Sequence, residues 1–400
     1  MTAQTAILVA LALPLVGALG IALAGRVSAN LRETVTLVTA GGLAFTVWQL
    51  VPEIMAGGRP GVTLAEVLPG IDIAFTVEPL GMLFAALASG LWIVNSIYSI
   101  GYMRGNAEKN QTRFYVMFAV SLAATMGIAF AGNLFTLFLW YEVLTVSTYP
   151  LVAHAGTPEA RRGARTYVTI LLGTSIGLQL MAILITYSIT GTLDFREGGI
   201  LDGKLDPAWA GMLLALFVFG VGKAAVMPFH RWLPAAMVAP TPVSALLHAV
   251  AVVKGGVFFV LKVVIYVFGI DTLPAIDARQ WLLYIATATI LLAALMLYLL
   301  VRLPLAIIGN LRAGHRFRQG LAAALDDLRL SRMLGFLGID KADYLHRETA
   351  LEIQKQMQRC DACDDKERCD QVLEGETPVE TESLGFCANI DDLKSVRESR

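Results

Sequence analysis

The sequence predicts an all-α fold: a polytopic transmembrane helix bundle followed by a small soluble helical domain at the C-terminus. The 400-residue chain is 56% hydrophobic, and only 16% of its residues are charged, where soluble proteins carry roughly 25%. The charges are unevenly distributed, since residues 1–302 hold 31 of the 63 charged side chains and residues 303–400 hold the other 32. The net charge of -1 argues against nucleic acid as a partner.

Nine apolar segments approach the roughly 20 residues that a helix needs to cross a bilayer. They are residues 5–25, 33–55, 73–102, 114–131, 134–153, 166–191, 209–229, 243–269 and 280–302. The chain is apolar from Ala6 to Ala24 with no basic residue before it, so we interpret this segment as a first span, not as a removed leader. The connection between residues 131 and 134 is so short that it predicts a tight antiparallel hairpin.

Basic residues in the short loops predict the orientation. The loops after the first, third, fifth and seventh spans hold nine Lys and Arg residues, and the loops on the other side hold four. We therefore expect the N-terminus outside and, with nine spans, the tail in the cytoplasm.

Three domains follow from this pattern: a membrane domain at 1–302, a linker at 303–335 and a cytoplasmic cysteine-containing domain at 336–400. The linker alternates leucines and isoleucines with arginines, which fits either a basic amphipathic helix at the inner membrane surface or a plain stop-transfer flank. Residues 336–360 are predicted to be helical, and the chain after Cys369 is acidic and predicted to form loops.

Ionisable residues inside the spans are the candidate functional groups, because a charge at mid-bilayer requires a partner or a function. Glu142 is flanked by apolar residues for two turns on each side, and Thr145 lies one turn further along, where it could hydrogen-bond the carboxylate. Either a transport role or a structural ion pair between helices would explain Glu142.

Lys223 lies in a segment that is predicted to be broken. Pro228 removes the amide donor that would bond the carbonyl of Ala224, so we expect the helix to kink or open one residue past the lysine. Gly220 and Gly222 loosen the backbone before it. Freed carbonyls beside a buried ammonium favour an internal water site, and a kink needed only for packing is the alternative.

Two further groups follow in the next predicted span. His248 and Lys254 are six residues apart, about 120° around a straight helix, and could act as successive stations of a proton relay. A structural role for His248 is the alternative. Lys262 is either a further station or a lysine that snorkels outward, and His230 is a further candidate for the pathway. Glu78, before Pro79, is interpreted as a helix start near the interface.

Three stretches resemble one protein family. KAAVMPFHRWLPAAMVAPTPVSALLHAVAVVKGGVFFVLK (223–262) resembles the signature of the antiporter-like, proton-conducting subunits, which include the large membrane subunits of complex I and the D subunit of Mrp-type cation/proton antiporters. The fifth helix of that family resembles NLFTLFLWYEVLTVSTYPLVAH (133–154), and its third helix resembles EPLGMLFAALASGLWIVNSIYSIGYM (78–103). The residue pattern is most similar to that of the Mrp D type.

The resemblance implies roles for particular positions. Glu142 matches the glutamate of the fifth helix, Lys223 its ion-pair partner on the broken seventh helix, and His248 and Lys254 the relay of the eighth. Helices four to eight, at about 114–269, would form one half-channel. The family pattern continues past the ninth helix with a second half-channel, whereas this chain turns at about residue 295 towards its soluble tail. Two explanations remain open: a natural truncation fused to another gene's product, or a chain that needs a partner subunit to complete the path.

The tail contains all four cysteines, and it resembles a small alphaproteobacterial domain of uncharacterised function. The spacing of Cys360 and Cys363 is common in metal and redox sites, and Cys369 and Cys387 follow. Disulfides are rare in a reducing cytoplasm, so we expect either a zinc ion, an iron–sulfur cluster or four free thiols.

The first functional hypothesis is a proton-translocating subunit in a bacterial inner membrane. Its partners would be the lipid bilayer, other subunits of an antiporter or respiratory complex, protons, and sodium or potassium. The membrane domain carries neither a Rossmann fingerprint nor a P-loop, so we expect no cofactor there, and any NADH:quinone oxidoreductase activity would belong to the whole complex. The alternative is a non-conducting membrane anchor for a cysteine-rich metal-binding or regulatory module.

Overall fold

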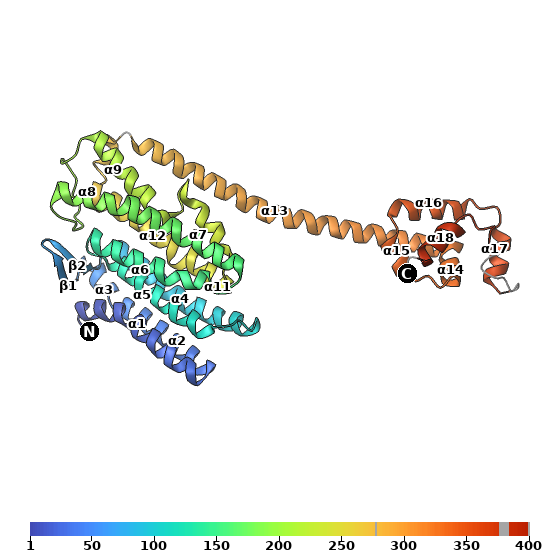
Figure 1. The fold of residues 1–400 in the computed structure, drawn as a ribbon, viewed down its shortest axis with the longest axis horizontal. Helices are drawn as coiled ribbons and strands as arrows, with labels where there is room; N and C mark the ends of the chain where they lie inside the picture. Colours follow the sequence, from blue (N-terminus) through green and yellow to red (C-terminus); the bar gives the residue numbers. More distant parts are fainter. Residues whose placement is uncertain (277, 376–383, 399–400) are drawn as a thin grey trace. The chain divides into compact units, whose positions relative to one another are not determined.

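A computed structural model describes residues 1–276, 278–375 and 384–398 (Figure 1). The description excludes the side chains of residues 275, 278, 292–293, 296–297, 299–301 and 303–316. The chain divides into two compact units, Met1–Leu291 and Leu292–Arg400.

The first unit is a bundle of long apolar helices, which confirms the predicted polytopic fold. In the described part of the chain, seven segments are long and apolar enough to cross a membrane. The first four of these segments are three single helices and one helix pair, and their bounds are α1 (Ala3–Val27), α2 (Ala29–Trp48) with α3 (Val51–Met55), α4 (Pro79–Gly105) and α5 (Gln111–Phe130).

The remaining three spans follow in the second half of this unit. The fifth span is α6 (Leu134–Val152), and the sixth is α7 (Pro158–Thr174) continued through a π-helical turn, η1 (Ser175–Gln179), into α8 (Leu180–Thr190). The last consists of α11 (Thr241–Ala245), the π-helical turn η5 (Leu246–Val250), α12 (Val252–Lys262) and the π-helical turn η6 (Val263–Phe268). A shorter apolar helix, α9 (Pro207–Gly220), occupies the predicted seventh position.

The ninth predicted span, residues 280–302, lies within the long helix α13 (Ala278–Asp326). Several of its side chains lie outside the described part of the chain, so a crossing at this position stays a prediction. The same holds for the amphipathic face proposed for residues 303–316 of the linker.

One start of a span was predicted wrongly, because a β-hairpin precedes it. Strands β1 (Gly61–Leu68) and β2 (Ile71–Thr76) pair antiparallel, with Leu68 opposite Ile71 across the Pro69–Gly70 turn. The segment is rich in Val, Ile and Thr, which favour strands, and Gly70 has a φ of 74°, which glycine adopts readily. Helix α4 therefore begins at Pro79 and not at residue 73.

Local capping explains why consecutive spans reverse direction so sharply. Ser28 ends α1 and begins α2: its amide donates to the carbonyl of Ala24 at 3.1 Å, and its hydroxyl accepts from the amide of Leu31 at 3.1 Å. Residues 131–133 join α5 to α6, and Asn133 caps α6 by accepting from the amide of Thr136 at 2.7 Å. Helices α5 and α6 pack along each other, so the predicted tight hairpin is confirmed.

Helix α5 is the central helix of the bundle, with 78% of its membrane window buried inside the protein. It packs against α1, α4 and α6, while α1 and α2 form an outer pair (Figure 1). The outer helices expose large apolar side chains, which a membrane protein presents to lipid and a soluble protein would bury. They include Leu15, Leu19, Leu23, Val38, Phe45, Leu83, Val94 and Ile97.

The second unit has its own core of small helices. These are the C-terminal part of α13, α14 (Arg329–Phe336), α15 (Lys341–Arg347), α16 (Ala350–Asp361), α17 (Lys366–Leu373) and α18 (Ile390–Glu398). Their apolar side chains, among them Leu325, Leu334, Tyr344 and Leu393, form a separate buried cluster. The expectation of loops after Cys369 was wrong in part, because α17 extends to Leu373 and α18 follows.

Candidate functional site

The break in the seventh predicted span lies on both sides of Lys223. Helix α9 ends at Gly220, and a short 3-10 turn, η2 (Gly222–Ala224), carries the lysine. Ala225 follows with a φ of 54°, an uncommon conformation for a residue with a side chain. We had expected the helix to open one residue after Lys223, but it opens two residues before it.

Close approach of neighbouring backbones explains the position of this break. A side chain at Gly222 would lie 2.3 Å from the Thr174 hydroxyl, and one at Gly256 would lie 2.3 Å from the amide nitrogen of Ala224. Only glycine permits such contacts. Helix α12 and the end of α7 are therefore pressed directly against the backbone that carries Lys223.

Lys223 is completely buried, and its ammonium is held by helix α6. Nζ donates to the carbonyl of Tyr141 at 2.8 Å and to the hydroxyl of Thr145 at 2.5 Å. It also lies 3.1 Å from the centre of the Tyr141 ring, and the Tyr141 hydroxyl accepts from the lysine's own amide at 3.0 Å. A buried cation is thus compensated by two oxygens and an aromatic face.

Glu142 follows Tyr141 on the same helix. Both of its carboxylate oxygens are buried and have no hydrogen-bond partner within the described residues. Lys223 and Ser175 are the groups that act electrostatically on this carboxylate, yet the described Glu142 and Lys223 side chains form no direct ion pair. The structure therefore places both residues where α6 meets η2, without a direct bond between their side chains. The predicted hydrogen bond from Thr145 to Glu142 was wrong, because the Thr145 hydroxyl accepts a hydrogen bond from the Lys223 ammonium.

His248 and Lys254 occupy different environments in the last span. His248 lies on the π-helical turn η5, half-buried, and its Nε2 has no hydrogen-bond partner in the described part of the protein. Lys254 lies on α12 on an exposed face. The structure therefore does not place Lys254 in the buried pocket of Lys223. His230, in the short 3-10 turn Phe229–Arg231, is also exposed.

Lys262 is buried and pairs with Glu78. The two side chains form an ion pair, and the lysine lies 4.3 Å from the ring centre of Phe195 and 5.0 Å from that of Tyr266. Glu78 does begin a helix, as expected, but it is 5% exposed and its side chain makes no capping bond. Sequence reasoning considered each residue alone and missed the pair, since its members are 184 positions apart.

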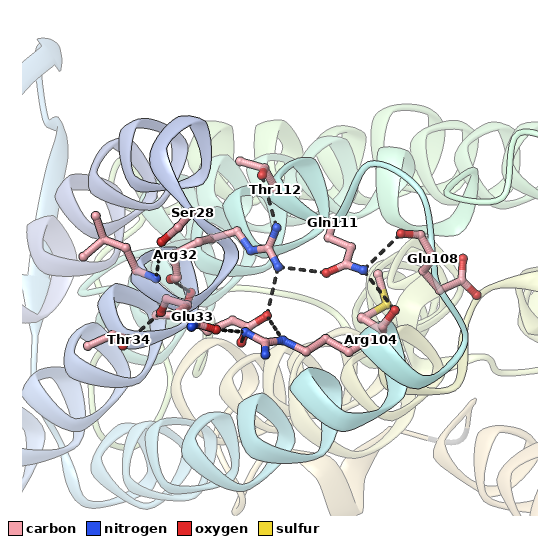
Figure 2. A network of polar contacts seen from close by, with 12 residues as sticks. Ser28, Arg32, Glu33, Thr34, Arg104, Glu108, Gln111 and Thr112 are labelled. Carbon is pink, nitrogen blue, oxygen red and sulfur yellow. Dashed lines mark hydrogen bonds and ion pairs between the residues drawn. The ribbon is translucent and has the colours of Figure 1, made fainter.

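A second buried charge network was also missed. Figure 2 shows Glu33 between two arginines: Oε1 accepts from Arg32 at 2.9 Å, and Oε2 accepts from Arg104 at 2.5 Å. Arg32 donates further to Gln111 at 2.8 Å. The network joins α2, α4 and the start of α5. An Arg-Glu pair at the edge of the second span was the sequence signal that could have revealed it.

The four cysteines gather around one pocket of the C-terminal unit. Cys360, Cys363, Cys369 and Cys387 line it together and are free thiols. Burial raises the pKa of Cys360 and Cys387, and it raises that of Cys369 to about 11. Among the described residues, no three Cys, His, Asp or Glu side chains are arranged as a metal-ion ligand set. The structure thus brings the four thiols together around one pocket, and the expected zinc ion or iron–sulfur cluster stays a prediction.

Residues 131–298 match the family model described as NADH:quinone oxidoreductase/Mrp antiporter, transmembrane. The match supports the antiporter-like membrane subunit family that the sequence resembles. Helices α6 to α12, with Glu142, Lys223 and His248, lie within the matched segment. Residues 326–399 match a second model, a family of unknown function.

Plastid and bacterial proteins are among the relatives that this chain resembles. A chloroplastic NAD(P)H-quinone oxidoreductase subunit 5 from Adiantum capillus-veneris is 33% identical over 235 residues, which cover 56% of this chain and 31% of that protein. A protein of Rhizobium meliloti described as the A/B component of a probable K(+)/H(+) antiporter is 30% identical over 233 residues, 56% of this chain and 22% of that protein. The chain thus spans less than a third of either relative.

Two solved structures share the fold. The Mrp complex from Dietzia sp. contains a chain with a TM-score of 0.59 and 26% identity, over 66% of this chain and 29% of that chain. An archaeal membrane-bound sulfane sulfur reductase has a chain with a TM-score of 0.55 and 22% identity, over 63% of this chain and 51% of that chain. The second likeness concerns the fold alone.

Proposed function

We propose that this chain is a proton-translocating membrane subunit of a multisubunit monovalent cation/proton antiporter or of a complex-I-like NADH:quinone oxidoreductase. One observation carries the proposal: a completely buried lysine on a broken helix binds α6 at Tyr141 and Thr145, next to Glu142, whose carboxylate oxygens are buried. Burying an isolated ionisable group inside a bilayer costs free energy, so a pair of this kind is expected to have a function there. The similarity to antiporter and quinone oxidoreductase subunits supports the same conclusion.

The proposed mechanism is a switch between two positions of the Lys223 ammonium. In one arrangement, which the structure describes, Tyr141 and Thr145 hold it and Glu142 is not bonded to it. In the other arrangement Glu142 binds the ammonium directly, and the lysine retains its proton. When the pair separates, the lysine can release that proton towards His248, whose Nε2 has no competing partner in the described part of the chain.

Lys254 would be the outlet of this path from the chain. Because it is exposed on α12, we propose that it passes the proton to a neighbouring subunit instead of to another buried group of this chain. Redox chemistry in a partner or a sodium or potassium gradient would set the position of the switch. Lys262 belongs to a separate buried pair with Glu78, and His230 lies on an exposed turn, so we give both a lesser part.

The proposal is tested by proton movement in inverted vesicles that contain the whole complex. Glu142→Gln and Lys223→Ala should each reduce coupled proton transport by at least tenfold, because each removes one half of the switch. Lys204→Ala, which removes an exposed loop lysine, is the matched control and should transport normally. Normal transport by both pathway variants would exclude the proposal.

The alternative, a membrane anchor for a metal-binding or regulatory module, has one observation in its favour. Four free thiols line a single pocket of the C-terminal unit. Metal analysis of the same purified preparations distinguishes the two functions. A stoichiometric metal that is lost on mutation of the cysteines, together with unchanged transport in the Glu142 and Lys223 variants, would favour the alternative.

We further propose that the protein lies in a bacterial inner membrane with its N-terminus outside and its C-terminal unit in the cytoplasm. The bias of basic residues to one set of loops supports this orientation. Several of the relatives are bacterial antiporter subunits, which supports the membrane and the assembly with other subunits.

A further inference from the structure

A basic hollow lies where four spans end on one side of the bundle. Its walls are the α4–α5 connection, residues 106–110, and the segment from the end of α6 to the first turns of α7. Its volume is about 690 Å³, which falls within the range of pockets that hold small molecules. None of the Glu142, Lys223 and His248 side chains lines it.

The charges around this hollow are strongly unbalanced. Lys109, Arg113, Arg161 and Arg165 line it, and all four are exposed. None of these four forms an ion pair with a carboxylate of the described residues. Glu108 is the one acidic residue among the lining residues. Arginines and lysines that converge without carboxylate partners produce a positive potential that attracts an anion.

A buried histidine also lines the hollow. His154 follows the end of α6, is 4% exposed, and neither of its ring nitrogens has a hydrogen-bond partner among the described residues. Its nearest carboxylate oxygen, from Glu108, is 3.9 Å away. Burial and the nearby Arg113 lower the pKa of His154, so the ring is neutral at pH 7 and has one N–H to donate.

The walls of the hollow are held rigidly in place. Gln111 donates to the carbonyls of Met103 at 3.0 Å and Glu108 at 3.1 Å, and its side-chain oxygen is fixed by Arg32 of the buried network in Figure 2. Across the hollow, Arg113 donates to the carbonyl of His154 at 3.1 Å. Arg113 and the α4–α5 connection are therefore positioned before any ligand arrives, which reduces the entropy lost on binding.

We propose that this hollow binds a phosphate anion, either the phosphodiester headgroup of an anionic phospholipid or free phosphate. Three arginines offer planar pairs of N–H donors, which match phosphate oxygens. His154 would add a neutral donor. Basic pockets at the ends of transmembrane helices are a usual binding place for anionic headgroups, and this hollow lies at such a position.

The test uses the full-length chain and counts bound lipid by native mass spectrometry. The protein is taken from bilayers of equal phosphatidylglycerol and phosphatidylcholine. Arg161→Ala/Arg165→Ala should lower the affinity for phosphatidylglycerol about thirtyfold, since each basic residue contributes several-fold. Arg162→Ala is the matched control, because Arg162 is an exposed neighbour on α7 that does not line the hollow.

Inorganic phosphate separates the two sources of the anion. Bound phosphatidylglycerol that phosphate does not displace, and that only the double variant loses, identifies the lipid headgroup. Phosphate that binds the wild type and the control but not the double variant, without retained lipid, identifies the free anion. Equal binding of lipid and of phosphate by all three proteins would overturn the proposal. So would a double variant that loses only its partner subunits, which would assign the hollow to an acidic protein segment.

Discussion

At the residue scale, the described structure explains how a lysine can remain buried in a membrane protein. The Lys223 ammonium has no carboxylate in contact, and its compensation comes from one carbonyl, one hydroxyl and one aromatic ring. Each of these is weaker than an ion pair, so the cation is held without being trapped. A group that has to exchange its proton requires this intermediate strength of binding.

Thr145 is the contact of Lys223 that can be removed most cleanly. Thr145→Val keeps the shape of the side chain but deletes the hydroxyl that accepts from Nζ. A hydrogen bond to a charged group is worth roughly 1.5–3 kcal/mol, so we expect proton transport to slow about tenfold or more. Thr186→Val, whose buried hydroxyl bonds only the carbonyl of Ala182, should transport normally. Equal rates in both variants would contradict this role of Thr145.

The Glu78–Lys262 pair predicts an effect on stability. Glu78→Gln leaves a buried ammonium without its counter-charge, which typically costs about 3–5 kcal/mol. Thermal unfolding of the purified protein in detergent should show a markedly lower midpoint. The double variant Glu78→Gln/Lys262→Met removes the charge as well and should recover most of the loss. A double variant no more stable than Glu78→Gln would show that charge pairing is not the cause.

At the element scale, irregular helices concentrate around the candidate site. The span that carries His248 includes two π-helical turns, the sixth span includes one at residues 175–179, and α9 stops before Lys223. Such turns free backbone carbonyls and amides, and in a membrane they are tolerated where protein or a cavity surrounds them. The regular helix α5 instead packs against α12 and is itself supported by α1 and α2.

Two neighbouring glycines of α12 test this packing. Gly256→Ala would place a methyl group 2.3 Å from the amide nitrogen of Ala224, so the backbone of η2 must shift and we expect a loss of about 1–3 kcal/mol of stability. Gly255→Ala would meet side chains at 3.6 Å, an ordinary contact, and should be close to neutral. Thermal unfolding and proton transport measured side by side should separate the two. Equal effects would show that the close approach does not shape the site.

At the scale of the whole molecule, the chain combines two units with different chemistry. Residues 131–298 match the family model that is described as NADH:quinone oxidoreductase/Mrp antiporter, and the C-terminal unit has a separate core and four free thiols. The orientation of the chain determines which compartment those thiols meet. The excess of basic residues in one set of loops makes the cytoplasm the expected compartment.

Thiol labelling tests this orientation. A membrane-impermeant maleimide should label the tail in inverted vesicles and not in right-side-out vesicles. Because burial raises the pKa of Cys369 to about 11, its labelling should accelerate as the pH rises towards that value. The raised pKa also means that the thiol stabilises this unit below pH 9.0 and that this contribution disappears as the pH rises towards 11. Labelling from the outside would reverse the proposed orientation.

The sequence by itself determined the apolar spans, the hairpin at residues 131–133, and the division between an apolar and a charged part. It also determined that Glu142 and Lys223 lie within apolar segments. These features are local, because length, hydropathy and a charged residue in an apolar run can be read along the chain. The β-hairpin at residues 61–76 was missed, since its apolar residues continue without a gap into the next span.

The tertiary structure alone decided the partners. Thr145 contacts Lys223 and not Glu142, Lys262 meets Glu78, Arg32 and Arg104 share Glu33, and Lys254 faces outward. Each of these outcomes depends on which face of one helix meets another, and the close approaches at glycines set those faces. Hydropathy is nearly uniform around a membrane helix, so it carries little information about that rotation.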